Sequence, residues 1–207
     1  MTKETDDLLR KGLDRLGIPW NDQQIGAFST YLSELKKWNR AYNLTGLKSG
    51  RDIMVKHFFD SLLFLKVLPD GVASAADIGS GAGFPGIPVK IMTPGLKIFL
   101  LEPVKKKAAF LRHVCSKLAL ENIDVLDLRI EDAGGFRVDA AMTRALYSVG
   151  EFIEKAGRIL TEKGVLILSK GPKLPEELRG IDMRRVTISD LDLPFEGITR
   201  HLVVVRP

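Results

Sequence analysis

The segment that decides the fold reads Ala75-Ala76-Asp77-Ile78-Gly79-Ser80-Gly81-Ala82-Gly83-Phe84-Pro85-Gly86. Its first residues are typical of a buried strand, and the glycines that follow let the chain turn tightly and approach a ligand closely. A helix that starts near Gly86 presents free N–H groups and the positive end of its dipole to that ligand. The segment therefore predicts a strand, a nucleotide-cofactor turn and a helix in succession.

The glycines can be read in two registers, Gly79-x-Gly81-x-Gly83 or Gly81-x-Gly83-x-x-Gly86. The second register matches the dinucleotide fingerprint. Two neighbours favour the first register. Asp77 can accept from a cofactor ammonium or from an ordered water but would repel a pyrophosphate, and Pro85 falls where the dinucleotide motif needs close packing of helix on strand. The turn therefore favours S-adenosylmethionine over a nicotinamide cofactor.

Acidic residues after the next two strands extend this site. Glu102 ends the second strand, 23 residues beyond Gly79, where a carboxylate can accept from both ribose hydroxyls of an adenosyl group. The pair Glu131-Asp132 follows the third strand and is placed to border the adenine. Either acid alone could equally be a solvated surface group, but their coincidence with the glycine turn favours a binding role.

The chain divides into two parts with different patterning. Residues 1–70 show helical spacing of apolar residues, as from Ile25 to Leu35, and contain no good strand. Pro69-Asp70-Gly71 has the turn chemistry of a boundary. We therefore expect an N-terminal helical subdomain over residues 1–70 and a cofactor-binding domain over residues 71–207.

Residues 71–207 alternate strand-like and helix-like runs, which indicates a parallel sheet with helices on both faces. The last two strand-like runs, 184–188 and 201–205, are followed by no helix and suit an antiparallel pair at the sheet edge. The predicted class is α/β, a Rossmann-like sheet with a terminal antiparallel hairpin. The other expected strands are 72–78, 97–102, 123–128, 138–143 and 164–169, and the expected helices begin near residue 86 and cover 105–118 and 151–160.

The composition excludes several classes of protein. The 207 residues include 31 Lys plus Arg and 26 Asp plus Glu, a net charge of +5. The single cysteine, Cys115, excludes an intrachain disulfide and is expected to be a small buried residue, and with three histidines there is no cluster at metal-ligand spacing. The charged amino terminus is no secretion signal, and no apolar run is long enough to span a membrane. We expect a cytoplasmic monomer without a metal or a membrane partner.

The positive charge is concentrated in two segments without acids, 35–51 and 103–120. Each has five basic residues, and Trp38 and Tyr42 lie in the first segment. Such segments attract phosphate backbones, and interleaved aromatic rings can stack on bases. The alternative is a pair of solvated helix faces with Trp38 in the core. With an adenosyl pocket beside them, the segments favour a nucleic-acid substrate. Its candidate contacts are Lys36, Lys37, Arg40, Lys105, Lys106 and Lys107.

Further motifs run through almost the whole chain. The most specific are Asn43-Leu44-Thr45 and the extension of the glycine turn, Phe84-Pro85-Gly86-Ile87-Pro88. Others are Trp38-Asn39, His57 with Asp60-Ser61-Leu62, Lys106-Lys107 with Phe110-Leu111, Thr143-Arg144-Ala145, and Lys170-Gly171 followed by Glu176-Glu177-Leu178. With these motifs the chain resembles the bacterial small-subunit ribosomal RNA guanine-N7 methyltransferases, the glucose-inhibited division B family.

The resemblance implies a class I S-adenosylmethionine-dependent methyltransferase that modifies N7 of one guanine in the decoding-region loop of 16S rRNA. The partner would be 16S rRNA or the 30S subunit. A small polar residue often follows the acid where this chain has Pro103. The residues that the resemblance assigns to the cofactor are Gly79, Gly81, Phe84, Glu102 on the ribose, Ile130, Glu131 and Arg144.

Guanine N7 has a lone pair and no proton, so its attack on a sulfonium methyl group requires no general base. Arg144, at the end of the fourth strand, can hold the guanine O6 or a phosphate, and Lys170 after the fifth strand can do the same. The alternative for Arg144 is a surface ion pair with Asp139 or Glu151. We expect His57 to fix a helix–helix contact.

Other functions on this fold stay open from the sequence, because a fold does not determine a function. One is a methyltransferase of a small molecule or a protein. Others are a nicotinamide-dependent oxidoreductase and an RNA-binding module without catalytic activity.

Overall fold

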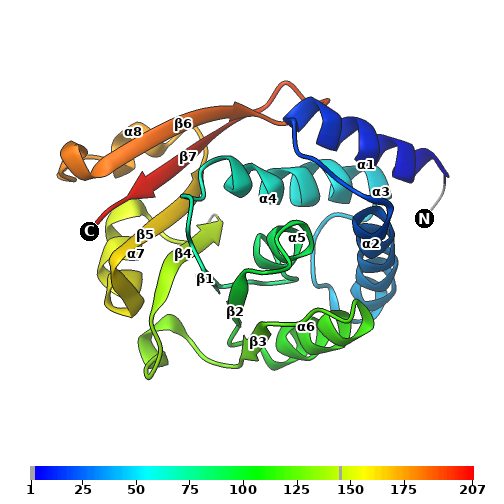
Figure 1. Ribbon diagram of the computed structural model, residues 1–207, viewed down its shortest axis with the longest axis horizontal. Helices are drawn as coiled ribbons and strands as arrows, with labels where there is room; N and C mark the ends of the chain where they lie inside the picture. The colour runs from blue at the N-terminus through cyan, green and yellow to red at the C-terminus, as the bar shows by residue number, and fades with distance from the viewer. Residues whose placement is uncertain (1–2, 145) are drawn as a thin grey trace.

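The computed structural model describes residues 3–144 and 146–207 and contains one seven-stranded sheet with helices on both faces (Figure 1). Ala145, the last residue of one motif above, lies outside the described residues. The strand order is β3-β2-β1-β4-β5-β7-β6. The strands are β1 (Ser74–Ile78), β2 (Lys97–Leu101), β3 (Ile123–Leu126), β4 (Val138–Arg144), β5 (Leu160–Lys170), β6 (Val186–Asp192) and β7 (Thr199–Val205).

Strands β1 to β5 pair in parallel, and β7 pairs antiparallel with both β5 and β6. The predicted α/β class and the terminal antiparallel pair are therefore confirmed. The strand order reverses at β1, which lies between β2 and β4. Open α/β sheets bind ligands at such a reversal, in the crevice at the carboxyl ends of the strands. The fold thus places the turn after β1 at this crevice.

Helices cover the two faces of the sheet unequally. α5 (Gly86–Met92) and α6 (Lys105–Lys117) share one apolar core with the N-terminal helices, and α7 (Val149–Ala156) packs in a second core on the other face. The predicted helix 151–160 ends earlier, at Ala156, because Leu160 already pairs with Val138 in the sheet. β6 continues past its predicted end because its polar residues pair with β7.

The N-terminal half is helical, as predicted. Asn21 and Gln24 form a reciprocal cap at the start of α2. The apolar core of this half is continuous with the core under α5 and α6, and the division at residue 70 stays a prediction. Its elements are α1 (Lys3–Leu16), α2 (Asp22–Tyr42), α3 (Gly50–Ile53), the π-helical η1 (Met54–Phe59), α4 (Asp60–Leu62) and the 3-10 turn η2 (Leu63–Lys66).

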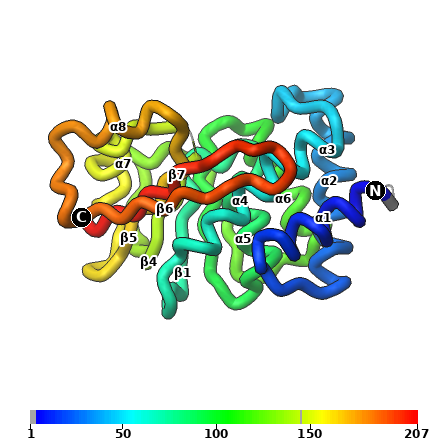
Figure 2. The backbone as a smooth tube through the Cα atoms, turned by 90° about the horizontal axis from the view of Figure 1, so that it is seen from above, coloured from blue at the N-terminus to red at the C-terminus, as the bar shows by residue number. Residues whose placement is uncertain are grey.

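Short helical turns and the terminal hairpin complete the fold. The loop between β6 and β7 reaches across to the N-terminal helices (Figure 2), where Glu196 pairs with Arg51 at 2.8 Å and Arg15 lies over the ring of Phe195. The remaining elements are α8 (Leu174–Glu177), η3 (Ile130–Asp132), η4 (Gly157–Ile159) and η5 (Met183–Arg185).

Candidate active site

The turn after β1 uses its glycines in two ways. Gly81 has φ +59°, and a Cβ there would meet nothing closer than 3.9 Å, so it borders open space. At Gly86 a Cβ would lie 2.4 Å from Leu100 Cδ2 and 2.8 Å from Asp77 Oδ2. Helix α5 therefore packs closely on the strands. The expectation that Pro85 opposes close packing at Gly86 is wrong, because Pro85 precedes the helix and leaves Gly86 to make the contact.

Asp77 lies beneath the turn and is fully buried. Its Oδ2 accepts from the Gly86 N–H at 2.8 Å, which holds the start of α5 against β1. Its Oδ1 is buried and has no partner among the described residues. Burial raises the pKa of Asp77 to about 7. The side chain thus braces the turn, and Oδ1 is the carboxylate oxygen left without a partner among the described residues.

Glu102 ties three elements together at the end of β2. Its Oε2 accepts from Gly81 N at 2.8 Å and its Oε1 from Val104 N at 2.9 Å, and the residue is buried. A carboxylate oxygen has two lone pairs, so each oxygen retains one for a ribose hydroxyl. The predicted cofactor residues Gly81 and Glu102 are therefore in direct contact.

A cavity of about 300 Å³ lies against the turn. The predicted residues Gly79, Ile130 and Glu131 all line it. Its walls are mostly apolar, which suits a flat adenine ring, and Glu131 supplies a carboxylate at the rim. Sequence reasoning missed Leu146 and Tyr147, which also line the cavity and whose only signal is their place just after β4.

Phe84 lies in the core with its ring between the helical half and the turn. The ring stacks on His57 at 4.5 Å and on Tyr31 at 5.5 Å, and Phe84 is only 5% exposed. Tyr31 in turn donates to Ala82 O at 2.6 Å. The ring of Phe84 therefore packs between protein groups, and its predicted cofactor contact stays a prediction.

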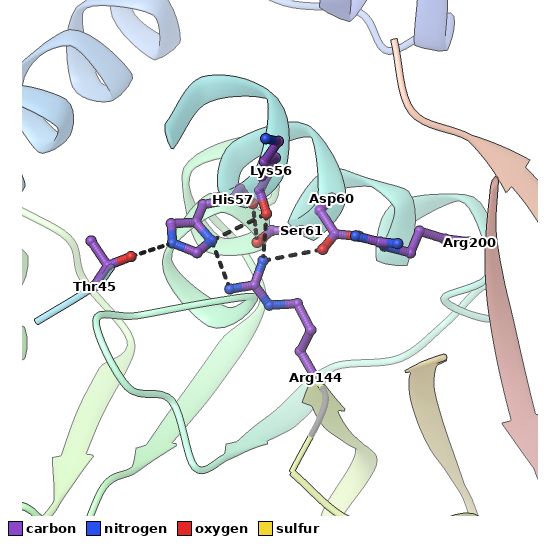
Figure 3. Close-up of polar contacts among 7 residues, drawn as sticks. All are labelled: Thr45, Lys56, His57, Asp60, Ser61, Arg144 and Arg200. Atoms are coloured by element: carbon purple, nitrogen blue, oxygen red, sulfur yellow. Dashed lines mark hydrogen bonds and ion pairs between the residues drawn. The ribbon is translucent and has the colours of Figure 1, made fainter. Parts of the chain in front are cut away.

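Arg144 does not line the cavity; it points from the end of β4 towards the N-terminal helices (Figure 3). Its Nη1 donates to Lys56 O at 3.0 Å and to Asp60 Oδ2 at 3.2 Å. Its Nη2 donates to His57 Nδ1 at 2.9 Å. Asp60 also accepts from Arg200 Nε at 3.0 Å. Two arginines thus neutralise one buried carboxylate.

These contacts correct the alternative given for Arg144 and the expectation for His57. The alternative partners Asp139 and Glu151 make no ion pair with Arg144, because Asp139 lies at the opposite end of β4 and Glu151 caps α7. His57 does not link two helices; it joins η1 to β4 and to Thr45. Lys56 and His57 belong to a π-helical turn, a geometry frequent at functional sites.

The two basic segments meet because α2 packs on α6. Trp38 contacts the rings of Phe110 at 5.6 Å and His113 at 5.0 Å. Glu34 Oε2 lies 2.6 Å from His113 Nε2. Trp38 is therefore a packing residue, as the alternative reading held, whereas Tyr42 is 44% exposed. The predicted RNA contacts Lys36, Lys37, Arg40, Lys105 and Lys106 are exposed, and Lys107 is half-buried.

Lys170 differs from the other predicted RNA contacts. It is buried, pairs with Glu177 at 2.6 Å and donates to Tyr147 O. It therefore joins α8 to the segment after β4. The expected contact of Lys170 with guanine or phosphate does not match this buried, paired ammonium.

A family model described as GidB, rRNA small subunit methyltransferase G, matches residues 24–202. The chain belongs to this family. Proteins named ribosomal RNA small subunit methyltransferase G are similar over nearly the whole chain. The one from Alkaliphilus oremlandii is 33% identical over 98% of this chain and 90% of its own. The one from Francisella philomiragia is 36% identical over 97% of each chain.

Solved structures resemble the fold of this member of the methyltransferase G family. A ribosomal protein L11 methylase from Lactobacillus delbrueckii subsp. bulgaricus has a TM-score of 0.58 at 16% identity, over 71% of this chain and 76% of that one. TrmN from Thermus thermophilus has a TM-score of 0.54 at 14% identity, over 74% of this chain and 53% of that one. The predicted class I methyltransferase fold is confirmed.

Family membership also confirms the predicted enzyme class, a methyltransferase that uses S-adenosylmethionine, in place of the nicotinamide-dependent alternative. The residues at the crevice fit that cofactor. Gly81 borders open space, Glu102 keeps free lone pairs, and the cavity has the apolar walls that adenine requires. The buried and unpartnered Asp77 Oδ1 is an additional acceptor.

Three further features of the described part of the chain concern metal-ligand groups, membrane-spanning helices and the single cysteine. Residues 3–144 and 146–207 contain no group of His, Cys, Asp and Glu suited to a metal ion. No helix within them has the length and apolar character to cross a membrane. Cys115 is buried as predicted, and burial raises the pKa of its thiol to about 12, which makes it a poor nucleophile.

Proposed function

We propose that the protein transfers the methyl group of S-adenosylmethionine to N7 of a guanine in 16S rRNA, in the decoding-region loop. The observation that carries this proposal is the adenosyl-type crevice beside a basic surface on α2 and α6. Relatives named ribosomal RNA small subunit methyltransferase support the same substrate class. The substrate is 16S rRNA, free or within the 30S subunit.

The cofactor supplies an electrophilic methyl group on a sulfonium sulfur. The main chain of Gly79 and Gly81 holds it at the turn, Glu102 accepts from the ribose, and Ile130 and Glu131 border the adenine. Glu102 is already oriented by two N–H groups, so little ordering is required on binding.

Because N7 has no proton to remove, the residues need only align it with the methyl carbon and the sulfur. The polar side chains nearby agree with this requirement. His57 and Asp60 are occupied by Arg144, and Asp77 is buried beneath the turn. None of these three side chains is presented as a base to a substrate.

Arg144 can orient the guanine without leaving its partners. A guanidinium has five N–H groups, and three are used by Lys56, His57 and Asp60. The N–H at Nε and the second N–H at Nη2 have no acceptor in residues 3–144 and 146–207. They are free to donate to the guanine O6 or to a phosphate. The side chain is 17% exposed.

The exposed lysines and arginine of α2 and α6 bind phosphates. Such contacts release counterions, so binding weakens steeply as salt rises. Lys36, Lys37 and Arg40 are on α2, and Lys105, Lys106 and Lys107 begin α6. These two groups flank the packed contact through Trp38.

The test is methyl transfer to 30S subunits that lack the modification. The protein is incubated with these subunits and isotope-labelled S-adenosylmethionine, and the 16S rRNA is digested to nucleosides. We expect label in 7-methylguanosine. Label in another nucleoside would overturn the N7 assignment, and no label in rRNA would favour a small-molecule or protein substrate.

A further inference from the structure

Three side chains form a relay from β4 to the loop after α2 (Figure 3). Arg144 Nη2 lies 2.9 Å from His57 Nδ1, and His57 Nε2 lies 2.7 Å from Thr45 Oγ1. A guanidinium can only donate, so Nδ1 must be the lone-pair nitrogen of the imidazole. The ring proton is therefore on Nε2 and is donated to Thr45. Lys56 O, 3.1 Å from Nδ1, accepts from Arg144 Nη1 instead.

The imidazole keeps this arrangement over the physiological pH range. Burial and the neighbouring Arg144 lower the pKa of His57 to about 3. The ring also stacks on Phe84, which limits its rotation. His57 is thus a neutral side chain with one tautomer and one orientation.

The relay determines where the Thr45 hydroxyl proton points. Thr45 Oγ1 accepts from His57 Nε2 and from Leu47 N at 3.2 Å, so both acceptor positions are occupied. Asn39 holds the same loop, because its Oδ1 accepts from Thr45 N at 2.8 Å and its Nδ2 donates to Leu47 O at 3.2 Å. The hydroxyl proton has no acceptor in the described part of the chain and must point away from these groups.

Thr45 lines a basic groove of about 730 Å³. Its lining has three cations, Lys36, Arg40 and Lys48, and no acid. The exposed Tyr42 directly precedes Asn43, which also lines the groove. A fixed neutral donor among cations suits a polyanion that presents oxygen acceptors, such as single-stranded RNA.

We propose that the Thr45 hydroxyl donates a hydrogen bond to the substrate RNA in this groove, and that His57 is the positioning residue that orients it. The acceptor is a phosphate oxygen or a base carbonyl. This inference rests on the proposed rRNA substrate and adds a substrate contact on the side of the helical half. It also connects that contact to Arg144, so RNA in the groove and guanine at the crevice share one set of hydrogen bonds.

The test compares Thr45→Val, which keeps the shape, with Thr45→Ser, which keeps the hydroxyl. Methyl transfer to undermethylated 30S subunits gives kcat and KM, and calorimetry gives the affinity for S-adenosylhomocysteine. A single hydrogen bond contributes about 1 kcal/mol, so we expect Thr45→Val to raise KM about fivefold. S-adenosylhomocysteine affinity should be unchanged, and Thr45→Ser should restore KM. Thr187→Val, at an exposed position on β6, is the matched control and should leave KM unchanged.

The outcomes separate the two proposals. No methyl transfer by the unaltered protein refutes the proposed function. Normal transfer with an unchanged KM in Thr45→Val, or an equal loss in Thr45→Ser, refutes the role of the hydroxyl.

The positioning role of His57 has its own test. His57→Phe keeps the stacking on Phe84 and removes both ring nitrogens, so Thr45→Val should add little in that background. Additive effects of the two substitutions on KM would refute the relay. Binding of RNA of unrelated sequence distinguishes the two possible acceptors. If the acceptor is a phosphate oxygen, Thr45→Val should bind this RNA more weakly than the unaltered protein does. If the acceptor is a base carbonyl, the two proteins should bind it equally.

Discussion

Two aspartates mark opposite ends of the sheet, and their polar atoms are satisfied differently. At the amino end, Asp139 Oδ2 accepts from Ala73 N and from Ser74 N and Oγ, and its Oδ1 accepts from Thr161 Oγ1. Desolvation opposes ionisation, but these hydrogen bonds hold the pKa of Asp139 below its usual value. At the carboxyl end, Asp77 has one unpartnered oxygen and a pKa raised by burial to about 7.

Two helix starts show the same contrast. Helix α2 begins with the reciprocal cap of Asn21 and Gln24. Asp22 lies in its first turn, where a negative charge interacts favourably with the helix dipole. Helix α6, at the crevice, has Val104 as its N-cap residue without a side-chain cap, and its first three residues are lysines. Cations at this end oppose the dipole. The side chains at the start of α2 therefore stabilise the helix. Those at the start of α6, beside the crevice, oppose helix stability and favour binding.

The largest expected effect concerns the buried carboxylate at the crevice. The pKa of Asp77 rises from 3.8 to about 7 on folding, so the folded state binds the proton more tightly. Its contribution to stability is present below pH 4 and is lost as the pH rises to 7, by up to about 4 kcal/mol. Asp77→Asn should remove this loss, as measured by denaturant unfolding from pH 4 to 8.

Asp139→Asn is the matched control at the other end of the sheet. Its pKa is lowered on folding, so the contribution of Asp139 to stability is complete above the unfolded pKa of 3.8 and is lost as the pH falls below that value. The pH-dependent difference from the parent protein should therefore lie above pH 4 for Asp77→Asn and below pH 4 for Asp139→Asn. Parallel pH profiles for parent and Asp77→Asn would contradict the contrast between the two ends.

Arg144→Ala should lower rRNA methylation about 100-fold, because a misplaced reactant loses a near-attack alignment. The fold should persist, since Asp60 keeps its ion pair with Arg200. Labelled methyl transfer measures the loss, and thermal melting checks the fold. Arg137→Ala, at the amino end of β4, is the control and should retain activity. Full activity of Arg144→Ala would contradict the assignment of the crevice.

Asp139→Ala should lower stability and leave methylation unchanged, the reverse of the result expected for Arg144→Ala. It leaves two N–H groups and two hydroxyls without their acceptor, which lowers the free energy of unfolding by about 2 kcal/mol. Methyl transfer per folded molecule should be unchanged below the melting temperature. A loss of kcat in fully folded protein would show that the amino end also serves catalysis.

The smallest effects are expected at the two helix starts. Asn21→Ala should lower the free energy of unfolding by about 1 kcal/mol through loss of the cap. Replacing Lys105 and Lys106 by Glu should raise it by about 1 kcal/mol, because acids favour the start of a helix. The same double variant should bind RNA more weakly and with a flatter salt dependence. Equal RNA affinity at all salt concentrations would remove α6 from the binding surface.

Local features were predictable from the sequence, and contacts between distant segments were not. The strand, turn and start of α5 around Gly81 follow from adjacent residues, and Glu102 and Ile130 follow from strands ending at one edge. In contrast, Asp60 meets Arg144 across 84 positions and Arg200 across 140. No periodicity encodes such a pairing, so the ion pair that the sequence offered as an alternative for Arg144 named Asp139 or Glu151 and not Asp60.

The burial of individual side chains could not be predicted from the sequence either. Lys170 follows a strand and resembles an exposed cation in sequence, but the short α8 folds back and brings Glu177 to it. Trp38 and Tyr42 are one helical turn apart in the same basic segment. Only the packing of α2 on α6 partly buries the first ring and leaves the second exposed.

The most direct test of the division between the two ends of the sheet is the titration of isotope-labelled protein with S-adenosylhomocysteine, followed by amide chemical shifts in solution. We predict that the large shifts are confined to the carboxyl end, at Gly79, Gly81, Glu102 and Ile130. The amides of Ala73 and Ser74, which bond to Asp139, should be unchanged. Large shifts at the amino end, with none at the glycine turn, would contradict the account.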